Sequence, residues 1–387
     1  MRRVLLIAYY FPPQPKAGAL RPSYLAEHLP TFGWQPTVLT VEFPGDRPAG
    51  VDVISVRPLG ARSGANATQS AEPPSPRRRS DSERRLRALA RTIVFFPDDQ
   101  VVWQLPARAA ALRLTASQQF DAVLSTAPPI SSHFVARAVA KARALPWIAD
   151  YRDLWAGPAG PYFDREFGPI KRSIAYASER WLLRPAAALT APTDGHAKAL
   201  AEYFARPDAE MIPNASDMSI WDKIVAPDPK EFRFCYAGKL YPRLRTPDVV
   251  FSAIAKLRAA GDPAGLAARF DFYGEDPHLV AESARTYGLT DVVTIHGEVP
   301  RRDALAAQRG SAVLLLLLNT AGDVDHIEIV NPGSKILEYA GARRPILAVG
   351  SRNNSMETTV RETGLGLFAS DDETCAQAIR KLHADFS

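Results

Sequence analysis

Short, continuously apolar runs alternate along this chain with segments whose apolar residues recur at helical spacing. Phe134, Val135, Ala138, Val139 and Ala142 form one such helical stripe. The runs that we interpret as strands are, in chain order, Val4–Tyr10, Gln35–Val41, Val51–Arg57, Asp121–Ser125, Trp147–Asp150, Ala187–Ala191, Glu210–Ile212, Phe232–Ala237, Arg269–Tyr273, Val292–His296, Val313–Leu318, Pro345–Val349 and Gly366–Ala369. Continuously apolar strands that alternate with helices indicate parallel sheets covered on both faces. The pattern therefore predicts an α/β fold with two doubly wound domains.

The length of 387 residues also favours two domains, because it exceeds what one hydrophobic core usually organises. Pro, Asp and Asn accumulate at 213–230, where no long periodic pattern continues. We therefore predict an N-terminal domain at 1–212, a linker at 213–230 and a C-terminal domain at 231–387. A Ser-, Ala- and Pro-rich stretch followed by an arginine cluster predicts a flexible basic insert at about 60–91.

The segment Asn331–Pro345 lies between two predicted strands and carries the strongest chemical signal. A helix that begins near Gly333 and Ser334 would direct its free backbone N–H groups at the preceding loop, where anions bind favourably. Lys335 would lie in the first turn, and Glu338 one turn later can accept both hydroxyls of a ribose. The pattern predicts a site for a nucleoside diphosphate. The alternative is a surface Lys and Glu on an ordinary crossover helix.

The loop after the first predicted strand contains Gly18, just before a helix that begins at about Arg21. In a doubly wound sheet, ligands bind beyond the carboxyl ends of the strands. Gly18 has no Cβ and would allow the backbone to approach a ligand, although a plain turn glycine is the alternative. The three-glycine dinucleotide fingerprint and the Walker phosphate loop are both absent.

The composition is that of an ordinary globular protein, with 46% apolar and 23% charged residues. Cys235 and Cys375 provide neither a disulfide framework nor a spaced metal motif, which indicates a reducing cytoplasm. The apolar run at the N-terminus is short and is followed by Pro12-Pro13, so a buried first strand explains it better than a signal peptide does. We expect no essential metal and no other cofactor.

Several short motifs occur in order along the chain. They are Tyr9-Tyr-Phe-Pro-Pro13 with Gly18 and Arg21-Pro22, Pro97-Asp98 with Trp103, Ser125-Thr-Ala-Pro-Pro129 with Ser131-Ser-His133, Pro146 to Trp155, Ile212-Pro-Asn214, Tyr236-Ala-Gly238, Tyr273-Gly274, His296-Gly297 and Pro332 to Pro345. Together they resemble bacterial glycosyltransferases of family 4, which are group 1-like and have the GT-B architecture. The resemblance runs through nearly the whole chain, and the order and spacing of the motifs make it specific.

The resemblance implies a GT-B fold, with two Rossmann-like domains facing a cleft. It implies a retaining transfer of a sugar, of the hexosyltransferase type, from a nucleoside diphosphate donor to a glycan acceptor. The C-terminal domain would hold the donor and the N-terminal domain the acceptor. Glu338 would bind the ribose, Lys335 would lie near the diphosphate, and Gly18 would approach the same phosphates from the other domain. Closure of the cleft would exclude water.

Relatives also place a basic residue from the loop after the first strand of the second domain on the diphosphate. The candidates in this chain are Lys239, Arg243 and Arg245, of which we favour Arg243. Stabilisation of the charge that develops on the leaving group is often the largest catalytic contribution. Solvated basic residues in a surface loop are the alternative.

Asp150, Arg152 and Asp153 close a predicted strand at the expected cleft. Two carboxylates can orient acceptor hydroxyls, while Arg152 fixes their geometry through charge-assisted hydrogen bonds. A structural ion network is the alternative. Many relatives carry a histidine near this strand end, where this chain has Arg152. His133 is a second candidate for substrate binding, and a plain helix-capping segment explains it at least as well.

A further departure from the family concerns the donor sugar. Many members carry two glutamates separated by seven residues, and the first one handles the sugar. The equivalent of that first glutamate is Val330. The sugar-facing role would then fall to the backbone of 330–333 or to Glu328, which is equally explained as a loop carboxylate.

The positive charge is concentrated at Arg77–Arg91, which contains seven Arg, one Asp and one Glu. From Ser82 this segment has the pattern of a basic amphipathic helix, which suits the anionic inner face of a membrane. A partly disordered loop with a solvated helix edge is the alternative. We expect no nucleic acid as a partner, because no aromatic interleaving or nucleic-acid module accompanies the arginines.

Three functions remain open from the sequence. The first is a glycosyltransferase that acts in the cytoplasm, peripherally on the membrane, on a lipid-linked acceptor in surface polysaccharide or lipopolysaccharide synthesis. The second is a sugar-nucleotide 2-epimerase. The third is a non-catalytic GT-B partner subunit that has lost donor binding.

Overall fold

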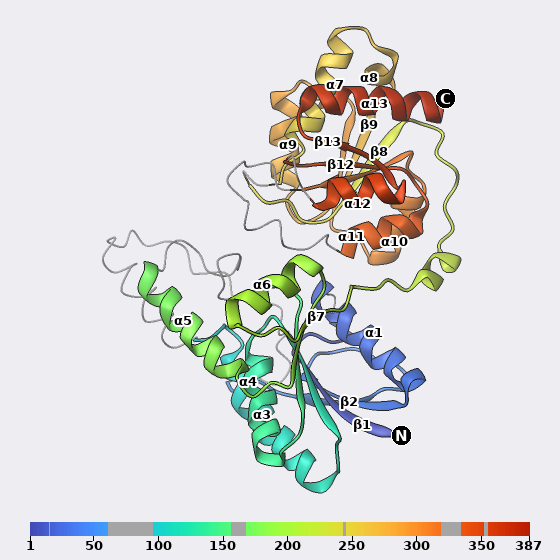
Figure 1. Ribbon diagram of the computed structural model, residues 1–387. Coiled ribbons are helices and arrows are strands. Elements are labelled where there is room, and N and C mark those ends of the chain that lie inside the picture. The colour runs from blue at the N-terminus through green and yellow to red at the C-terminus, as the bar shows by residue number, and fades with distance from the viewer. Residues whose placement is uncertain (15, 61–95, 156–167, 243–244, 319–333, 352–354) are drawn as a thin grey trace. The chain divides into compact units, whose positions relative to one another are not determined.

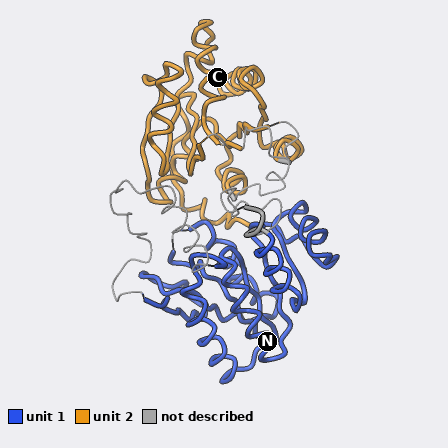
Figure 2. Tube along the Cα trace, turned by 90° about the vertical axis from the view of Figure 1, so that its left-hand side faces the viewer, with its two compact units in different colours: residues 1–214 blue, residues 215–387 orange. Residues whose placement is uncertain are grey.

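The computed structural model describes residues 1–14, 16–60, 96–155, 168–242, 245–318, 334–351 and 355–387. The chain forms two compact units, Met1–Asn214 and Ala215–Ser387 (Figure 2). The predicted basic insert falls almost entirely outside the described residues, as do Arg243, Gly333, Glu328 and Val330.

Unit 1 is built on a seven-stranded parallel sheet with the order β3-β2-β1-β4-β5-β6-β7 (Figure 1). Its strands are β1 (Arg2–Ala8), β2 (Trp34–Val41), β3 (Asp52–Val56), β4 (Ala122–Ala127), β5 (Trp147–Tyr151), β6 (Ala188–Ala191) and β7 (Ala209–Met211). Its α-helices are α1 (Leu20–His28), α3 (Val101–Ser117), α4 (Ser131–Arg143), α5 (Gly168–Leu183) and α6 (Asp194–Phe204), and the short 3-10 helices are η1 (Ala17–Ala19) and η2 (Leu29–Phe32).

The continuous apolar character of the central strands in unit 1 follows from burial on both faces. Leu5, Leu6 and Ile7 of β1 have no exposed surface. Leu6 packs in a cluster with Ala26 of α1 on one side of the sheet, and α4 covers β1 and β4 on the other (Figure 1). Neighbouring strands pair in parallel, so their carboxyl ends meet along one edge of the sheet.

Unit 2 is built on a six-stranded parallel sheet with the order β10-β9-β8-β11-β12-β13 (Figure 1). Its strands are β8 (Arg233–Ala237), β9 (Arg269–Tyr273), β10 (Val293–Gly297), β11 (Val313–Leu317), β12 (Ile346–Val349) and β13 (Gly366–Ala369). Its helices are η4 (Met218–Lys223), α7 (Asp248–Ala259), α8 (Pro263–Ala267), α9 (Pro277–Thr286), α10 (Arg301–Arg309), α11 (Ser334–Ala342), α12 (Ser355–Thr363) and α13 (Asp372–Phe386).

The two faces of this second sheet carry separate cores. Phe234 and Phe270 pack in one cluster with residues of α7 and α13, including Ile254 and Ile379. The opposite face forms another cluster, in which Leu314 meets residues of α10, α11 and α12. Unit 2 is therefore also doubly wound, and each apolar run that the sequence predicted as a strand contains one, with bounds that differ by at most two residues.

The segment that the sequence analysis treats as a linker contributes to unit 2 through Trp221. The Trp221 indole is 3% exposed and packs on Gly341 of α11, where an added Cβ would lie 2.0 Å from Trp221 Nε1. Arg309 donates hydrogen bonds to the carbonyl oxygens of Trp221 and Ile224, at 2.5 and 2.8 Å. Within the described residues, no helix is long and apolar enough to cross a membrane.

Candidate functional site

Lys335 lies in the first turn of α11, at the carboxyl end of the unit 2 sheet. Its Nζ atom is 4.2 Å from the centre of the Tyr236 ring, on the neighbouring β8. Tyr236 is 1% exposed, and its hydroxyl donates a 2.8 Å hydrogen bond to the carbonyl oxygen of Lys239. An ammonium over an aromatic face is attracted by the ring quadrupole. Tyr236 therefore contacts one predicted binding residue and supports the backbone of another.

Gly238 follows β8 and makes room for this lysine. Its φ of 148° lies in a region that L-residues rarely adopt. A Cβ at Gly238 would lie 1.9 Å from Lys335 Nζ, and one at Gly274 would lie 2.2 Å from the Gly238 carbonyl oxygen. Glycine is therefore required at both turns for steric reasons, and the backbone at Gly238 passes directly beside the partly buried ammonium group of Lys335.

Burial, and after it the neighbouring charge of Arg245, lower the pKa of Lys335 to about 7. The carboxylate of Glu338 opposes this shift. Among the described residues, the ammonium group contacts the Tyr236 ring and forms no hydrogen bond or ion pair with a carboxylate. A partly buried cation without such a partner is stabilised by an added anion.

Glu338 lies one turn after Lys335 on α11, and both of its oxygens have partners. Gln308 of α10 donates a 2.7 Å hydrogen bond from Nε2 to Glu338 Oε1. A guanidinium nitrogen of Arg301 is 3.5 Å from Glu338 Oε2. Gln308 is 1% exposed, whereas the Arg301 side chain is 46% exposed. One oxygen is therefore fixed by a buried amide, and the other is held by a solvent-facing cation.

The other predicted donor-site residues lie near the same strand ends. Lys239 Nζ is 3.4 Å from Glu275 Oε2, and both side chains are about half exposed. Arg245 forms a backbone bridge with Tyr241, and its guanidinium lies 5.3 Å from the Tyr241 ring centre. Ser334 is the first residue of α11. Arg243 and Gly333 lie outside the described residues, so their predicted roles stay predictions.

In unit 1, Arg152 follows β5 and joins two neighbouring loops. Its guanidinium donates hydrogen bonds to the carbonyl oxygens of Gly18 and Pro128. An added Cβ at Gly18 would lie 2.5 Å from Arg152 NH1. The guanidinium is also 5.9 Å from the centre of the Tyr10 ring. Gly18 is therefore the point at which the β1–α1 loop meets the arginine.

The charge partner of Asp150 is Arg21, which differs from the expectation that Arg152 fixes both neighbouring carboxylates. Arg21 donates from Nε and NH2 to Asp150, with the shortest contact at 2.7 Å. Thr126 and Thr190 donate two more hydrogen bonds, at 2.9 and 2.7 Å. Burial alone would raise the pKa of Asp150, but the Arg21 charge and these donors hold the pKa below its usual value.

The Asp150 carboxylate is 1% exposed and accepts from three side chains, so its local role is to organise the protein itself. Arg21 extends this network to the end of unit 1, where its NH1 donates to the carbonyl oxygens of Ile212 and Pro213 at 2.8 and 3.0 Å. The alternative interpretation of Asp150 as part of a structural ion network fits this geometry.

Asp153 is partly exposed beyond the end of β5, and its charge raises the pKa of His196, against a larger lowering by burial. His133 has no exposed surface; its Nδ1 is 2.8 Å from Ser125 Oγ, which accepts a 2.7 Å hydrogen bond from Trp147 Nε1. Burial lowers the pKa of His133 to about 3, so the imidazole is neutral at physiological pH. The His133 side chain packs inside unit 1, and its predicted role in substrate binding stays a prediction.

A sequence model of the "Glycosyl transferase 4-like domain" matches residues 19–215. The chain belongs to this glycosyltransferase family. A second family model, "Glycosyl transferases group 1", matches residues 231–385, so both units of this glycosyltransferase are covered. No match was found among curated proteins.

Solved structures of similar fold include three enzymes. The sucrose-phosphate synthase of Thermosynechococcus elongatus is 16% identical, with a TM-score of 0.62 over 100% of this chain and 90% of that chain. TarM is 9% identical, with a TM-score of 0.59 over 100% and 95%. WaaG, a glycosyltransferase involved in lipopolysaccharide biosynthesis, is 13% identical, with a TM-score of 0.57 over 98% and 90%. At these identities the likeness shows a shared fold, which is GT-B.

Sequence reasoning missed the contacts of three residues: Arg21 in unit 1, and Tyr236 and Gln308 in unit 2. Arg21 stood in a motif, but nothing local to it signals a partner 129 positions away. Gln308 lies 30 positions before Glu338 on a helix with an ordinary polar pattern. Tyr236 sits in an apolar strand and is indistinguishable there from a core aromatic residue.

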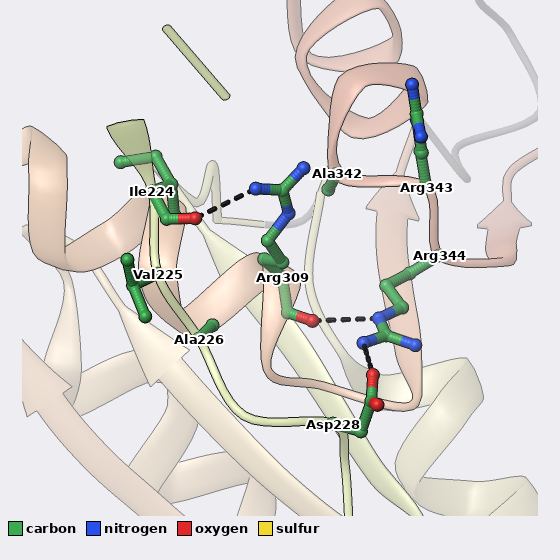
Figure 3. A pocket seen from close by; sticks show the side chains of 8 residues that line it. All are labelled: Ile224, Val225, Ala226, Asp228, Arg309, Ala342, Arg343 and Arg344. Carbon is green, nitrogen blue, oxygen red and sulfur yellow. Dashed lines mark hydrogen bonds and ion pairs between the residues drawn. The ribbon is translucent and has the colours of Figure 1, made fainter. Parts of the chain in front are cut away.

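A pocket of about 450 Å³ lies elsewhere in unit 2, at the C-terminal end of α11 (Figure 3). It is lined by Ile224, Val225, Ala226, Asp228, Arg309, Ala342, Arg343 and Arg344. Arg344 donates to Asp228 at 2.9 Å and to the Arg309 carbonyl oxygen at 2.8 Å (Figure 3). None of the predicted site residues lines this pocket. Across the described residues, no group of three His, Cys, Asp or Glu side chains could hold a metal ion.

Proposed function

We propose that this glycosyltransferase moves a sugar from a nucleoside diphosphate donor to a lipid-linked glycan acceptor, with retention at the anomeric carbon. The product would belong to bacterial surface polysaccharide or lipopolysaccharide, made on the cytoplasmic side of the membrane. The reaction would need no metal or other cofactor.

The observation that carries this proposal is the surroundings of Lys335. A partly buried ammonium group lies in the first turn of α11, beside a glycine turn, without a carboxylate partner among the described residues. The positive end of the helix and the lysine together favour an anion strongly. Glu338, one turn further on, offers a carboxylate to two adjacent hydroxyls. An anion and a diol at this spacing are the features of a ribose with a diphosphate.

The same groups would assist the reaction. As the sugar leaves, negative charge grows on the diphosphate, and a cation already in place stabilises that charge without reorganisation. The departing phosphate would take the proton of the acceptor hydroxyl on the face from which it leaves, which retains the anomeric configuration. Arg243 and Arg245 are the further basic residues that we propose for the diphosphate.

The experiment that tests the donor site is a melting curve of the full chain against ADP, GDP, UDP, CDP and TDP, followed by their sugar conjugates. A ligand present at about 100 times its dissociation constant stabilises the native state by roughly 2.7 kcal/mol. We expect one base to raise the melting temperature clearly. Lys335→Met and Glu338→Ala should each remove the shift, while Lys256→Met on α7 should keep it, because Lys256 pairs with Asp372 elsewhere in unit 2.

The outcomes separate the remaining alternatives. A stabilising nucleotide that still binds after both site substitutions would contradict the site. The absence of any shift would favour the partner subunit without donor binding. Consumption of the sugar nucleotide without acceptor, with a new sugar nucleotide as product, would favour the 2-epimerase. Loss of transfer on treatment with a chelator would contradict the proposal that no metal is needed.

A further inference from the structure

The outer side of α5 exposes two large apolar side chains, Ile174 and Trp181, which are 54% and 55% exposed. They are seven residues apart, about two helical turns, so they lie on the same side of the helix. The inner side of α5 already supplies Ala175, Leu182 and Leu183 to the core. The helix is therefore apolar on a second stripe, which the described residues of unit 1 leave uncovered.

Basic residues surround this stripe. The Arg137 guanidinium of α4 lies 3.8 Å from the centre of the Trp181 ring and donates to the Trp181 carbonyl oxygen at 2.9 Å. Arg180 and Arg184 are exposed beside Trp181, and Lys141 is exposed one turn after Arg137 on α4. Figure 1 shows α4 and α5 next to each other. We call these six residues the α4–α5 face: Arg137, Lys141, Ile174, Arg180, Trp181 and Arg184.

Negative charge is missing from the surface of these helices. The sequence of α4 contains no Asp or Glu, and neither does that of the adjacent α3. The one acidic residue of α5 is Glu179, which is 1% exposed and accepts a 2.8 Å hydrogen bond from the Tyr151 hydroxyl. The next helix, α6, differs, because it carries an exposed Asp194–Lys198 pair and an exposed Glu202. The positive field is therefore local to α3, α4 and α5.

We propose that the α4–α5 face binds the surface of a membrane that contains anionic phospholipid. Arginine and lysine near such a surface are attracted to its negative charge, and a partly apolar helix gains further by burying its exposed stripe among the headgroups. Tryptophan is enriched at this depth because its ring is apolar and its N–H is polar. An acidic nucleic acid or protein would use the cations but would gain little from Ile174.

This proposal deepens the proposed function, since a lipid-linked acceptor lies at a membrane, but its test needs neither donor nor acceptor. A failure to bind vesicles would therefore not contradict the proposed donor site. A failure to bind nucleotide would likewise not contradict the proposal for the α4–α5 face. It also places the contact on described residues, separately from the Arg77–Arg91 segment.

The test is co-sedimentation of the full chain with vesicles of phosphatidylcholine alone or mixed with phosphatidylglycerol. We expect binding to the mixed vesicles, weakening as salt rises. Ile174→Ser with Trp181→Ser should reduce the partition coefficient at least tenfold, and Arg180→Glu with Arg184→Glu should do the same. Melting curves should show that each variant remains folded.

The control variants make the same kinds of substitution at exposed positions of unit 2. Arg285→Glu with Arg361→Glu has the same charge change on unit 2, and Leu266→Ser removes a side chain that is 51% exposed there. Both controls should bind vesicles as the unaltered chain does. The proposal is overturned by any of three results: no binding to the mixed vesicles, wild-type binding by both α5 variants, or an equal loss in the charge-reversed control. Loss with the glutamate pair but not the serine pair would instead identify a polyanion surface and would also overturn it.

Discussion

The buried amide of Gln308 donates a 2.7 Å hydrogen bond to Oε1 of Glu338, which joins α10 to the carboxylate expected to hold a ribose. We expect Gln308→Met to weaken nucleotide binding roughly tenfold, because a hydrogen bond to a charged group contributes about 1.5 kcal/mol or more. Calorimetric titration with the preferred nucleoside diphosphate measures this. Gln377→Met on α13 is the matched control, since Gln377 donates an exposed hydrogen bond to Glu373 on the same helix. Equal affinities in all three proteins would remove Gln308 from the site.

Replacing Arg301 should have the opposite effect on nucleotide binding and increase the affinity. Its guanidinium is 3.5 Å from Glu338 Oε2, so a ribose that uses this oxygen must displace it. Half-exposed ion pairs of this kind contribute about 0.2–1 kcal/mol. Arg301→Gln is therefore expected to tighten nucleotide binding by up to about fivefold. The same titration reports the change, and a weaker affinity would mean that Arg301 itself binds the ligand.

Lys335 makes nucleotide binding depend on pH. Burial lowers the pKa of the free lysine to about 7, and a bound diphosphate would raise it, so binding takes up a proton above neutral pH. We expect the affinity to fall as pH increases from 7 to 9, and Lys335→Met to lose that dependence. Titrations in two buffers with different ionisation enthalpies measure the proton uptake directly. An unchanged heat in both buffers would contradict the assignment.

Lys335 also affects the stability of the ligand-free protein, with a defined sign. In the unfolded chain its pKa returns to about 10.5, so between pH 7 and 10.5 the unfolded state binds more protons than the folded state. The contribution of Lys335 to folding stability therefore rises with pH across this window. Melting temperatures of the unaltered chain and Lys335→Met should differ most at or below pH 7 and converge toward pH 10.

Asp150 is expected to matter for folding more than for transfer. Asp150→Asn leaves the buried Arg21 cation without its charge partner, and loss of one member of such a pair costs about 3–5 kcal/mol. Urea unfolding of unit 1 measures this cost. The control is Glu42→Gln, which breaks the exposed pair with Arg57 and should change stability little. A stable Asp150→Asn variant that has lost transfer would instead support a direct role with the acceptor.

Substitutions of Arg152 and Gly18 should have coupled effects on kcat/KM. Arg152 reaches two carbonyl oxygens with its planar guanidinium, a geometry that lysine cannot reproduce. We expect Arg152→Lys and Gly18→Ala each to lower kcat/KM, since a Cβ at Gly18 would press on Arg152. The double variant should lose less than the product of the two single losses. Independent, multiplicative losses would show that the two residues act separately.

The sequence predicted the strands because burial on both faces leaves a signal that is local. Ile7 and Leu315 are apolar with their neighbours on either side, and each lies in a strand. The start of α11 was also predicted, because Asn331, Pro332 and Gly333 precede it in the sequence. These elements were predicted because the pattern that marks each one lies in its own residues and their immediate neighbours.

The sequence held no comparable local pattern to predict which side chains contact one another. Arg152 was expected to hold Asp150 because only one residue separates them in the sequence, but closeness along the chain does not decide which cation reaches a buried carboxylate. The cation that reaches Asp150 comes from α1, and Arg152 turns to the carbonyl oxygens of two loops. Gln308 likewise gains its role only because α10 packs beside α11. Side-chain partners of this kind come from segments that are far apart in the sequence and meet only in the folded protein, so a local sequence pattern does not predict them.

Trp221 is a natural fluorescent reporter for the proposed donor site. Its indole lies against Gly341 on the same helix that carries Lys335 and Glu338, and Arg309 lies 5.5 Å from the ring centre. Indole emission is sensitive to nearby charge and to solvent access. The chain contains six tryptophans, so the difference between its emission and that of Trp221→Phe isolates this one. A small displacement of α11 when nucleotide enters would then be visible without any attached label.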